Sequence, residues 1–413
     1  MLTEICKKAK LASAELAQLS TEKKNKVLRE MASSLERDSE RILTANHKDV
    51  EAAKREGRSA ALLDRLALDE RKIKKMSQCL KEIAELPDPI GEIVKTWSRP
   101  NGLIIGQMRV PLGVVGVIYE SRPDVTSDAS GICLKSGNAA ILRGGSDAIN
   151  SNLAIGESIK SGLVAAGVPS YSIQVVSSTD RGIAEELMQM RDYIDVLIPR
   201  GGSDLIKTVV EKATIPVIET GLGNCHIYVE SDADLDKAVN IIVNAKCQRP
   251  GTCNAAEKLL VNEGVARNFV PRVIEALRAK GVEIRGDKET MKIVPDVKLA
   301  TEEDWHTEYL DLKIGIKIVR DLREAVSHIN TYGTKNSDAI LTANFEKAQQ
   351  FIRAVDSAAV YWNASTRFTD GNQFGFGAEI GISTQKMHAR GPMSVEQLTS
   401  TKYFILGSGQ IRE

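Results

Sequence analysis

The chain lacks a net charge, because its 55 basic residues balance its 55 acidic residues. Lys and Arg alternate with Asp and Glu along the whole sequence, which is typical of solvated helix faces. A nucleic-acid-binding protein needs a positive field that attracts a polyanion. We therefore expect a small-molecule substrate and no nucleic-acid partner.

Long apolar runs are also missing. The apolar stretches fall far short of the ~20 residues that a membrane-spanning helix needs, and the first residues lack the apolar core of a signal peptide. These absences predict a cytoplasmic protein with no membrane partner.

The cysteines show no metal-binding or disulfide pattern. The chain has six, at positions 6, 79, 133, 225, 247 and 253, without a CxxC pair or an adjacent pair of histidines. In a chain of 413 residues this spacing indicates neither a disulfide framework nor a zinc site. We expect reduced thiols and no metal.

Apolar residues make up 42% of the sequence, and their spacing predicts regions of different secondary structure along the chain. At ~150 residues per domain, the length predicts two or three domains. Residues 1 to about 86 repeat apolar side chains at helical spacing, with Ser20 and Asp69 as candidate N-caps. Residues 93–110 then read as a hairpin with an Asn-Gly turn, which leaves an apolar edge strand exposed.

Two sets of short apolar strands alternate with helices through the rest of the chain. This order predicts an α/β fold with parallel, doubly wound sheets. The first set comprises residues 113–118, 139–142, 173–176, 196–198 and 217–218. The second lies near residues 258–261, 282–284, 314–319, 339–341 and 358–361, and a final strand is expected at 402–406.

Ligands bind such sheets at the carboxyl ends of the strands. In the first set these ends are residues 119–123, 143–146 and 199–203. No GxGxxG turn follows a predicted strand, so a standard dinucleotide fingerprint is not indicated. The turn Arg200-Gly-Gly-Ser203 could present amide groups to a phosphate. A simple N-cap by Ser203 or Asp204 is the more common explanation for such a turn.

The loop from Gln248 to Asn254 carries the strongest chemical signal. Pro250 and Gly251 prevent a continuous helix, so Cys253 lies on a constrained turn where its sulfur can face a cleft. A cysteine nucleophile is one explanation, and a small buried apolar residue is the other. Glu219, at the end of the first set of strands, is either a general base or a structural carboxylate.

Several motifs together resemble the aldehyde dehydrogenase superfamily and, within it, the gamma-glutamyl phosphate reductases. Their order is collinear with that family over nearly the whole chain. They are Val117-Ile-Tyr-Glu-Ser-Arg-Pro123, Leu197-Ile-Pro-Arg-Gly-Gly-Ser203, Ile218-Glu-Thr-Gly-Leu-Gly-Asn224, Gln248-Arg-Pro-Gly-Thr-Cys253-Asn-Ala255, Asn363-Ala-Ser-Thr-Arg-Phe-Thr-Asp-Gly371 and Lys386-Met-His-Ala-Arg-Gly-Pro392.

The resemblance implies a division of the chain into domains. Residues 1–92 and 111–228 would form a cofactor-binding domain, and residues 229–362 a catalytic domain that carries Cys253. Residues 93–110 and 396–413 would form an oligomerisation arm, which implies a homo-oligomer. Residues 363–395 would form a returning glycine-rich segment.

The resemblance also implies NADPH-dependent reduction of L-glutamyl 5-phosphate to L-glutamate 5-semialdehyde and phosphate, in proline biosynthesis. Cys253 would form the thioester. A free thiol with a pKa of ~8.5 is only a few per cent ionised at pH 7, and Arg249 is the nearest candidate to stabilise its thiolate. Ser121 stands in the place of an asparagine in relatives and would be an oxyanion donor with the amide of Cys253.

The remaining site residues follow from the same resemblance. Gly201, Gly202 and Ser203 would contact the cofactor phosphates. Arg143 stands where relatives have a cofactor-contacting lysine. Arg122 and Arg367 are candidates for holding the amino-acid end of the substrate. A separate glutamate 5-kinase would be the partner that supplies the substrate.

Two other functions compete with this one. In a hydrolytic aldehyde dehydrogenase, Glu219 would activate water, whereas in the phosphate-linked reaction that activity would waste the thioester. A non-catalytic assembly protein would use the hairpin and the final strand instead of Cys253. Dependence of aldehyde oxidation on phosphate separates the first two functions, and thiol reactivity tests the third.

Overall fold

A computed structural model describes residues 1–412, apart from the side chains of residues 60 and 61, and position 413 of the predicted arm lies outside the described residues. The chain forms two compact units. Unit 1 contains Met1–Thr220, Gly375–Gly381 and the residues from Met393 onward, and unit 2 contains Gly221–Phe374 and Ile382–Pro392.

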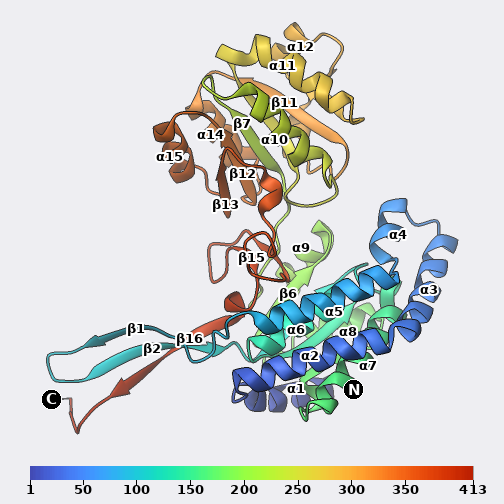
Figure 1. The fold of residues 1–413 in the computed structure, drawn as a ribbon, viewed down its shortest axis with the longest axis vertical. Coiled ribbons are helices and arrows are strands. Elements are labelled where there is room, and N and C mark those ends of the chain that lie inside the picture. The colour runs from blue at the N-terminus through green and yellow to red at the C-terminus, as the bar shows by residue number, and fades with distance from the viewer. Residues whose placement is uncertain (413) are drawn as a thin grey trace. The chain divides into compact units, whose positions relative to one another are not determined.

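The N-terminal region of unit 1 is helical, as predicted. Both predicted caps are confirmed, because the side chain of Ser20 accepts from the Lys23 amide at 3.2 Å and that of Asp69 from the Lys72 amide at 2.7 Å. α2 and α5 lie side by side (Figure 1). The helices are α1 (Leu2–Leu16), α2 (Thr21–Arg37), α3 (Ser39–Arg55), α4 (Ala60–Leu66) and α5 (Glu70–Glu85).

The sheet of unit 1 is parallel, with strand order β5-β4-β3-β6. Its strands are β3 (Val114–Tyr119), β4 (Ala139–Gly144), β5 (Ile173–Val175) and β6 (Val196–Arg200). Its helices are α6 (Asp124–Lys135), α7 (Ile149–Ala165), α8 (Arg181–Met188) and α9 (Ser203–Lys212), with short turns of 3-10 helix at η1 (Ser146–Ala148) and η2 (Ser170–Ser172). The predicted strand at 217–218 is reduced to one isolated bridge between Val217 and Leu197.

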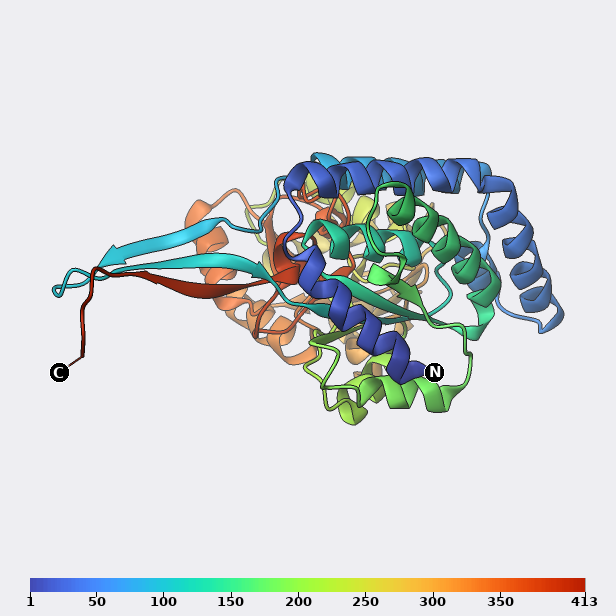
Figure 2. The ribbon, with the colours of Figure 1, turned by 90° about the horizontal axis from the view of Figure 1, so that it is seen from below.

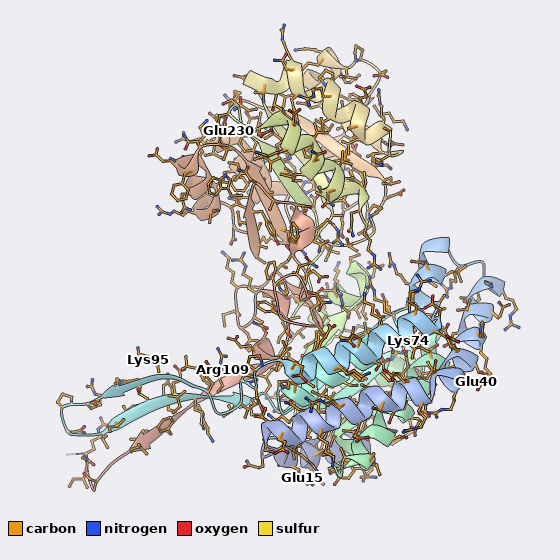
Figure 3. The ribbon with its side chains drawn as sticks, in the orientation of Figure 1. Glu15, Glu40, Lys74, Lys95, Arg109 and Glu230 are labelled. Carbon is orange, nitrogen blue, oxygen red and sulfur yellow. The ribbon has the colours of Figure 1, made fainter. Side chains whose placement is uncertain are left out.

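Three antiparallel strands form an arm that extends away from the helices of unit 1 (Figures 1 and 2). They are β1 (Ile93–Ser98), β2 (Ile104–Pro111) and β16 (Thr399–Leu406), in the order β1-β2-β16. The predicted hairpin and final strand are thereby confirmed. Arg109 lies where the arm joins the rest of unit 1 (Figure 3) and forms ion pairs with Glu92 at 2.9 Å and Glu396 at 2.5 Å.

Unit 2 contains a second parallel sheet, as predicted, in the order β10-β9-β11-β8-β7-β12-β13. The strands are β7 (Cys225–Val229), β8 (Ala256–Asn262), β9 (Glu283–Gly286), β10 (Lys298–Leu299), β11 (Lys313–Val319), β12 (Ser337–Leu341) and β13 (Ala359–Trp362). The helices are α10 (Leu235–Cys247), α11 (Glu263–Arg278), α12 (Lys288–Ile293), α13 (Glu302–His306), α14 (Leu322–Tyr332) and α15 (Phe345–Ala354). The chain continues through η3 (Thr366–Phe368), the paired strands β14 (Gly381–Ser383) and β15 (Gly391–Met393), and η4 (Glu396–Leu398).

Strand β7 is a central strand that the sequence patterning does not predict, and the short strands β10, β14 and β15 are not predicted either. It pairs with β8 on one side and with β12 on the other, so it lies inside the sheet of unit 2. A boundary at 228/229 would cut this strand. We therefore propose that the two α/β domains meet at 220/221.

The core of unit 2 covers both faces of its sheet. Ile227, Leu259 and Ala339 pack with α10 and α11 on one face. The next residue of each strand, such as Tyr228 and Leu260, packs with α14 and α15 on the other face. Burial on both faces explains why these strands are almost continuously apolar, and it fixes the loops at their ends.

Candidate functional site

The strand order of unit 1 brings the three predicted segments to one edge of its sheet. β3 lies between β4 and β6, so the three predicted segments leave the sheet at the same edge. Backbone contacts join two of them, because the amide of Glu120 donates to the carbonyl of Arg200 at 3.1 Å. The amide of Gly202 in turn donates to the Glu120 carboxylate at 3.0 Å.

The start of α9 differs from the simpler prediction. Ser203 is the first helical residue, Gly202 occupies the N-cap position, and no side chain of the described residues caps the helix. The prediction of a cap by Ser203 or Asp204 is therefore wrong. The first amide groups of the helix remain available to an anion, which the positive end of the helix dipole favours. A methyl group on Gly201 would lie 2.4 Å from a Glu120 carboxylate oxygen, so a side chain at this position would displace that carboxylate.

Two guanidinium groups lie at this edge of the sheet. The Nε atoms of Arg143 and Arg200 are buried and have no hydrogen-bond partner among the described residues. Arg143 also donates through Nη2 to the carbonyl oxygens of Thr179 at 3.1 Å and Asp180 at 3.4 Å. Burial lowers the pKa of Arg143, and the nearby Glu120 opposes that shift. Unpartnered donors beside uncapped helix amides suit a ligand that carries phosphate groups.

Ser121 is the second residue after β3 and has a φ of 46°, in the left-handed region that few side chains adopt. Its hydroxyl donates to the Asp147 carboxylate. For Ser121 to donate to an oxyanion, it would have to leave Asp147. Such backbone strain is common at functional sites.

In unit 2, the Cys253 loop joins α10 to β8 and therefore lies at the amino edge of the parallel sheet. α10 begins at the side-chain cap of Asp234, as its acidic first turn predicts. The loop is a tight turn, since the Thr252 hydroxyl donates to the Arg249 carbonyl at 2.8 Å and the Ala255 amide to the Thr252 carbonyl at 3.0 Å. Cys253 is half-buried on this turn.

Hydrogen bonds from the returning segment, residues 363–395, hold the Cys253 loop through Asn254 and Gln248. The Asn254 amide group donates to the Thr369 carbonyl at 2.7 Å, and the Asn254 carbonyl accepts from Thr366 at 2.7 Å. Arg367 donates to the Gln248 side chain at 2.8 Å and also to the Asn254 side chain. Its guanidinium thus bridges both ends of the turn that carries Cys253.

The guanidinium of Arg367 is also electrostatically coupled to the cysteine turn. Burial lowers its pKa, with Asp370 opposing, while the positive charge of Arg249 lowers it further and Cys253 raises it. Two guanidinium groups and the thiol therefore share one neighbourhood. A positive neighbourhood of this kind favours the thiolate form of a cysteine.

The segment Gly223-Asn224-Cys225 is a part of the site that sequence reasoning missed. It precedes β7 and packs on the backbone of Cys253, because a methyl group on Gly223 would lie 1.5 Å from the Cys253 carbonyl oxygen. The Cys225 thiol donates to the same oxygen at 3.1 Å. Gly221 and Gly223 in front of an apolar strand were the signal for a close backbone approach.

A buried charge cluster lies between β8 and α10 and was also missed. Lys246, Glu257 and Lys258 are each 0% exposed, and Lys246 forms an ion pair with Glu257 at 3.0 Å. Burial raises the pKa of Glu257 to about 7, against the opposing effect of Lys246. Burial lowers the pKa of Lys258 to about 7, against the opposing effect of Glu257. Two charged residues inside the apolar run of β8 were the available signal.

The predicted site residues fall into two groups. Ser121, Arg122, Arg143, Gly201, Gly202, Ser203 and Glu219 lie in unit 1, whereas Arg249, Cys253 and Arg367 lie in unit 2. Within the described residues there is no group of three or more His, Cys, Asp or Glu side chains able to hold a metal ion. A search of the same residues found no helix long and apolar enough to cross a membrane.

The fold and the cysteine turn define an enzyme of the aldehyde dehydrogenase class, and the model of the aldehyde dehydrogenase family matches residues 2–301. An acetylating aldehyde dehydrogenase from Geobacillus thermoglucosidasius shares the fold at a TM-score of 0.72 and 17% identity, covering 100% of this chain and 97% of that one.

Relatives of higher sequence identity show which family of this class the chain belongs to. The gamma-glutamyl phosphate reductase of Clostridium botulinum (strain Eklund 17B / Type B) is 58% identical over 98% of both chains. That of Caldanaerobacter subterraneus subsp. tengcongensis is 57% identical over 98% of both chains. The crystal structure of the Thermotoga maritima gamma-glutamyl phosphate reductase matches with a TM-score of 0.97 and 51% identity over 100% of both chains. The chain therefore belongs to the gamma-glutamyl phosphate reductase family, whose members are oxidoreductases, and the wider family implies a nicotinamide cofactor.

Proposed function

We propose that the chain reduces L-glutamyl 5-phosphate to L-glutamate 5-semialdehyde and phosphate with NADPH, as a step of proline biosynthesis. The observation that carries this proposal is the half-buried Cys253 on a turn beside Arg249 and Arg367. The names of relatives that match 98% of the chain supply the substrate.

In the first step, the Cys253 thiolate attacks the acyl carbon of the substrate. A carbon–sulfur bond forms, the carbon–oxygen bond to phosphate breaks, and phosphate leaves with the electron pair. Arg249 is exposed on the turn, where its guanidinium can meet the departing phosphate. Arg367 is bonded to the turn on both sides of Cys253 and holds the nucleophile in place.

In the second step, hydride adds to the thioester carbon to give a hemithioacetal oxyanion, whose carbon–sulfur bond then breaks to release the aldehyde and regenerate the Cys253 thiolate. When bound, NADPH would supply the hydride for this reduction. The backbone amide of Cys253 stabilises the negative charge that develops on the substrate oxygen. Ser121 is a second donor if its hydroxyl turns away from Asp147.

Unit 1 supplies the groups that fit a phosphorylated dinucleotide. The uncapped start of α9 offers the amide of Ser203, the Gly202 amide is held by the Glu120 carboxylate at 3.0 Å, and Gly201 keeps the turn free of a side chain. Arg143 adds a cation with an unpartnered Nε. Glu120 is one of the acidic groups at this edge, with Asp147, and carboxylates bind ribose hydroxyls in dinucleotide sites.

Glu219 and Arg122 are the remaining proposed site residues. Reduction of an acyl phosphate needs no water, so we assign Glu219 a role other than activating one. Arg122 follows Ser121 in unit 1 and is a candidate ligand, with Arg367, for the charged amino-acid end of the substrate. Acyl phosphates form by phosphoryl transfer to a carboxylate, so a separate glutamate 5-kinase would supply this substrate.

The deciding experiment runs the reaction backwards. Glutamate 5-semialdehyde and NADP⁺ are expected to react only when phosphate or arsenate is present, because the thioester needs an oxyanion acceptor. Rapid oxidation in phosphate-free buffer would instead establish hydrolysis.

Three variants are tested in the forward direction, in which NADPH is oxidised. Cys253→Ala is expected to abolish NADPH oxidation, whereas Cys247→Ala, which also removes a half-buried thiol, is expected to retain it. Glu219→Ala is expected to retain a substantial part of the wild-type rate. A complete loss in Glu219→Ala, equal to that in Cys253→Ala, would contradict the role that we assign to Glu219.

A further inference from the structure

The position of the Cys253 backbone depends on its contact with Gly223. Atoms of Cys253 surround the place that a Gly223 side chain would take, with the carbonyl oxygen at 1.5 Å, the carbonyl carbon at 2.1 Å and Cα at 2.4 Å. The Gly223 amide donates to Glu308 at 2.7 Å, which fixes the orientation of that peptide. A movement of Gly223 by a few tenths of an ångström must therefore move Cys253 as well, because close-packed atoms leave no slack.

Asn224 holds this segment in place. Its amide donates to the Thr334 hydroxyl at 2.9 Å. Its side-chain nitrogen donates to the carbonyl oxygens of Trp305 at 2.7 Å and Tyr332 at 2.8 Å. Its side-chain oxygen accepts from Lys258 Nζ at 2.8 Å. The polar groups of the Asn224 side chain are thus satisfied, which gives it a single orientation.

Lys258 is the ionisable end of this chain of contacts. Nζ donates to Asn224 Oδ1 and to the Thr307 carbonyl, each at 2.8 Å, and lies 4.4 Å from the centre of the Tyr309 ring. Glu257 on the same strand, Lys246 of α10 and Asp304 of α13 supply the charges around it. Cys225 of β7 and Glu308 also interact with it electrostatically.

Burying an ammonium group at this position costs a large desolvation free energy. Replacing buried charges by apolar side chains of similar volume is often neutral or stabilising, so stability alone does not account for Lys258. A charged donor does, however, fix its acceptors more strongly than a neutral one. That property suits a group that must hold a nearby nucleophile at one position.

We propose that Lys258 is a positioning residue for the reaction at Cys253, acting through Asn224 and Gly223. This inference rests on the proposed function, because it takes Cys253 as the nucleophile. Lys258 does not touch the substrate in this role. It sets the angle of attack of the sulfur, and small errors in that geometry cost rate more than binding.

The test compares two matched buried lysines. Lys258→Met keeps the apolar stem and removes both hydrogen bonds. Lys135→Met is the control, because Lys135 is also 0% exposed and also donates to an asparagine side chain, Asn25 at 2.6 Å, and to a backbone carbonyl, Ala84 at 2.8 Å. Lys135 lies at the end of α6 in unit 1, in neither group of proposed site residues.

In Lys258→Met we expect kcat to fall by about 10- to 100-fold with KM for the acyl phosphate within about 3-fold, as for a misplaced reacting group. The rate at which iodoacetamide alkylates Cys253, followed by mass spectrometry, is expected to fall with kcat. Lys258→Arg, which keeps charged donors, is expected to recover part of kcat. Lys135→Met is expected to leave kcat unchanged, whatever its effect on the melting temperature.

Equal kcat values in Lys258→Met and wild type, or a change in KM alone, would overturn the proposal. If Lys258→Met does not fold, Asn224→Ser breaks the same contact between Lys258 and residue 224 from the other side. This variant is likewise expected to lower kcat and leave KM within about 3-fold. An active Cys253→Ala variant would refute the proposed function itself, which keeps the two failures distinguishable.

Discussion

At the scale of single residues, the site depends on positions where a side chain cannot be added or moved. Gly223 adjoins the Cys253 backbone, and Gly201 adjoins the Glu120 carboxylate. Neither position needs glycine for a positive φ. Each needs it for close approach, which the sequence shows only as a glycine near an apolar strand.

Gly223→Ala tests this directly. The added methyl group must push the turn away, at a cost of roughly 1–3 kcal/mol of stability. Because the turn carries the nucleophile, we expect kcat to fall about 100-fold. Steady-state kinetics and a thermal melt measure the two effects.

Gly182→Ala is the control for this variant. Gly182 lies in the first turn of α8, where a new Cβ would have its closest contact at an ordinary 3.4 Å. Alanine is favoured over glycine in a helix by about 0.5–1 kcal/mol, so this variant should be as stable as wild type or more so, with full activity. A Gly223→Ala enzyme with wild-type kcat would show that the contact does not position Cys253.

At the scale of elements, the helix beside each of the two groups of proposed site residues begins in a different way. α10 begins with a side-chain cap, because the Asp234 carboxylate accepts from the Lys237 amide at 3.1 Å. At the start of α9, Gly202 occupies the N-cap position, and no side chain of the described residues caps the helix. The first arrangement serves stability, and the second leaves amide groups for a ligand.

Paired alanine variants separate these roles. Asp234→Ala removes a true cap and is expected to lower the free energy of unfolding by about 1 kcal/mol with unchanged kinetics. Ser203→Ala is expected to leave stability within about 0.5 kcal/mol of wild type, as for an uncapped surface position. It should nevertheless raise KM for NADPH. The reverse pattern, with stability lost in Ser203→Ala and KM unchanged, would restore Ser203 as a cap and remove it from the cofactor site.

At the scale of the whole molecule, the arm presents the clearest surface for assembly. Its outer strands β1 and β16 carry large exposed apolar side chains, among them Ile93, Tyr403, Ile405 and Leu406. Exposed edge strands of this kind are rare unless another chain covers them. We propose that the arm joins copies of this chain into a homo-oligomer.

Ile405→Glu places a charge on the apolar edge of β16, and we expect light scattering to show a smaller assembly at the same protein concentration. Ser400→Glu, at an exposed polar position of the same strand, is the control and should keep the wild-type mass. An unchanged mass in Ile405→Glu would remove β16 from the interface.

Much of this architecture could be predicted from the sequence. Local patterns identified the N-terminal helices, the hairpin, both sets of parallel strands and the turn at Cys253, because periodicity and turn chemistry depend on neighbours along the chain. They failed at β7, whose five residues follow a glycine-rich turn without a clear period, and at Val217, where a predicted strand is a single bridge. They also assigned a cap to α9 that the fold does not use.

The sequence by itself determined which residue types are present for the chemistry: one cysteine on a rigid turn, arginines near it and glycines at strand ends. Only the tertiary structure decided which of them meet. Strand order places β7 beside β8, so Gly223 contacts Cys253 across 30 residues and Lys258 reaches Asn224 across 34. Such contacts arise from the pairing of strands and the close packing around them, which no local pattern encodes.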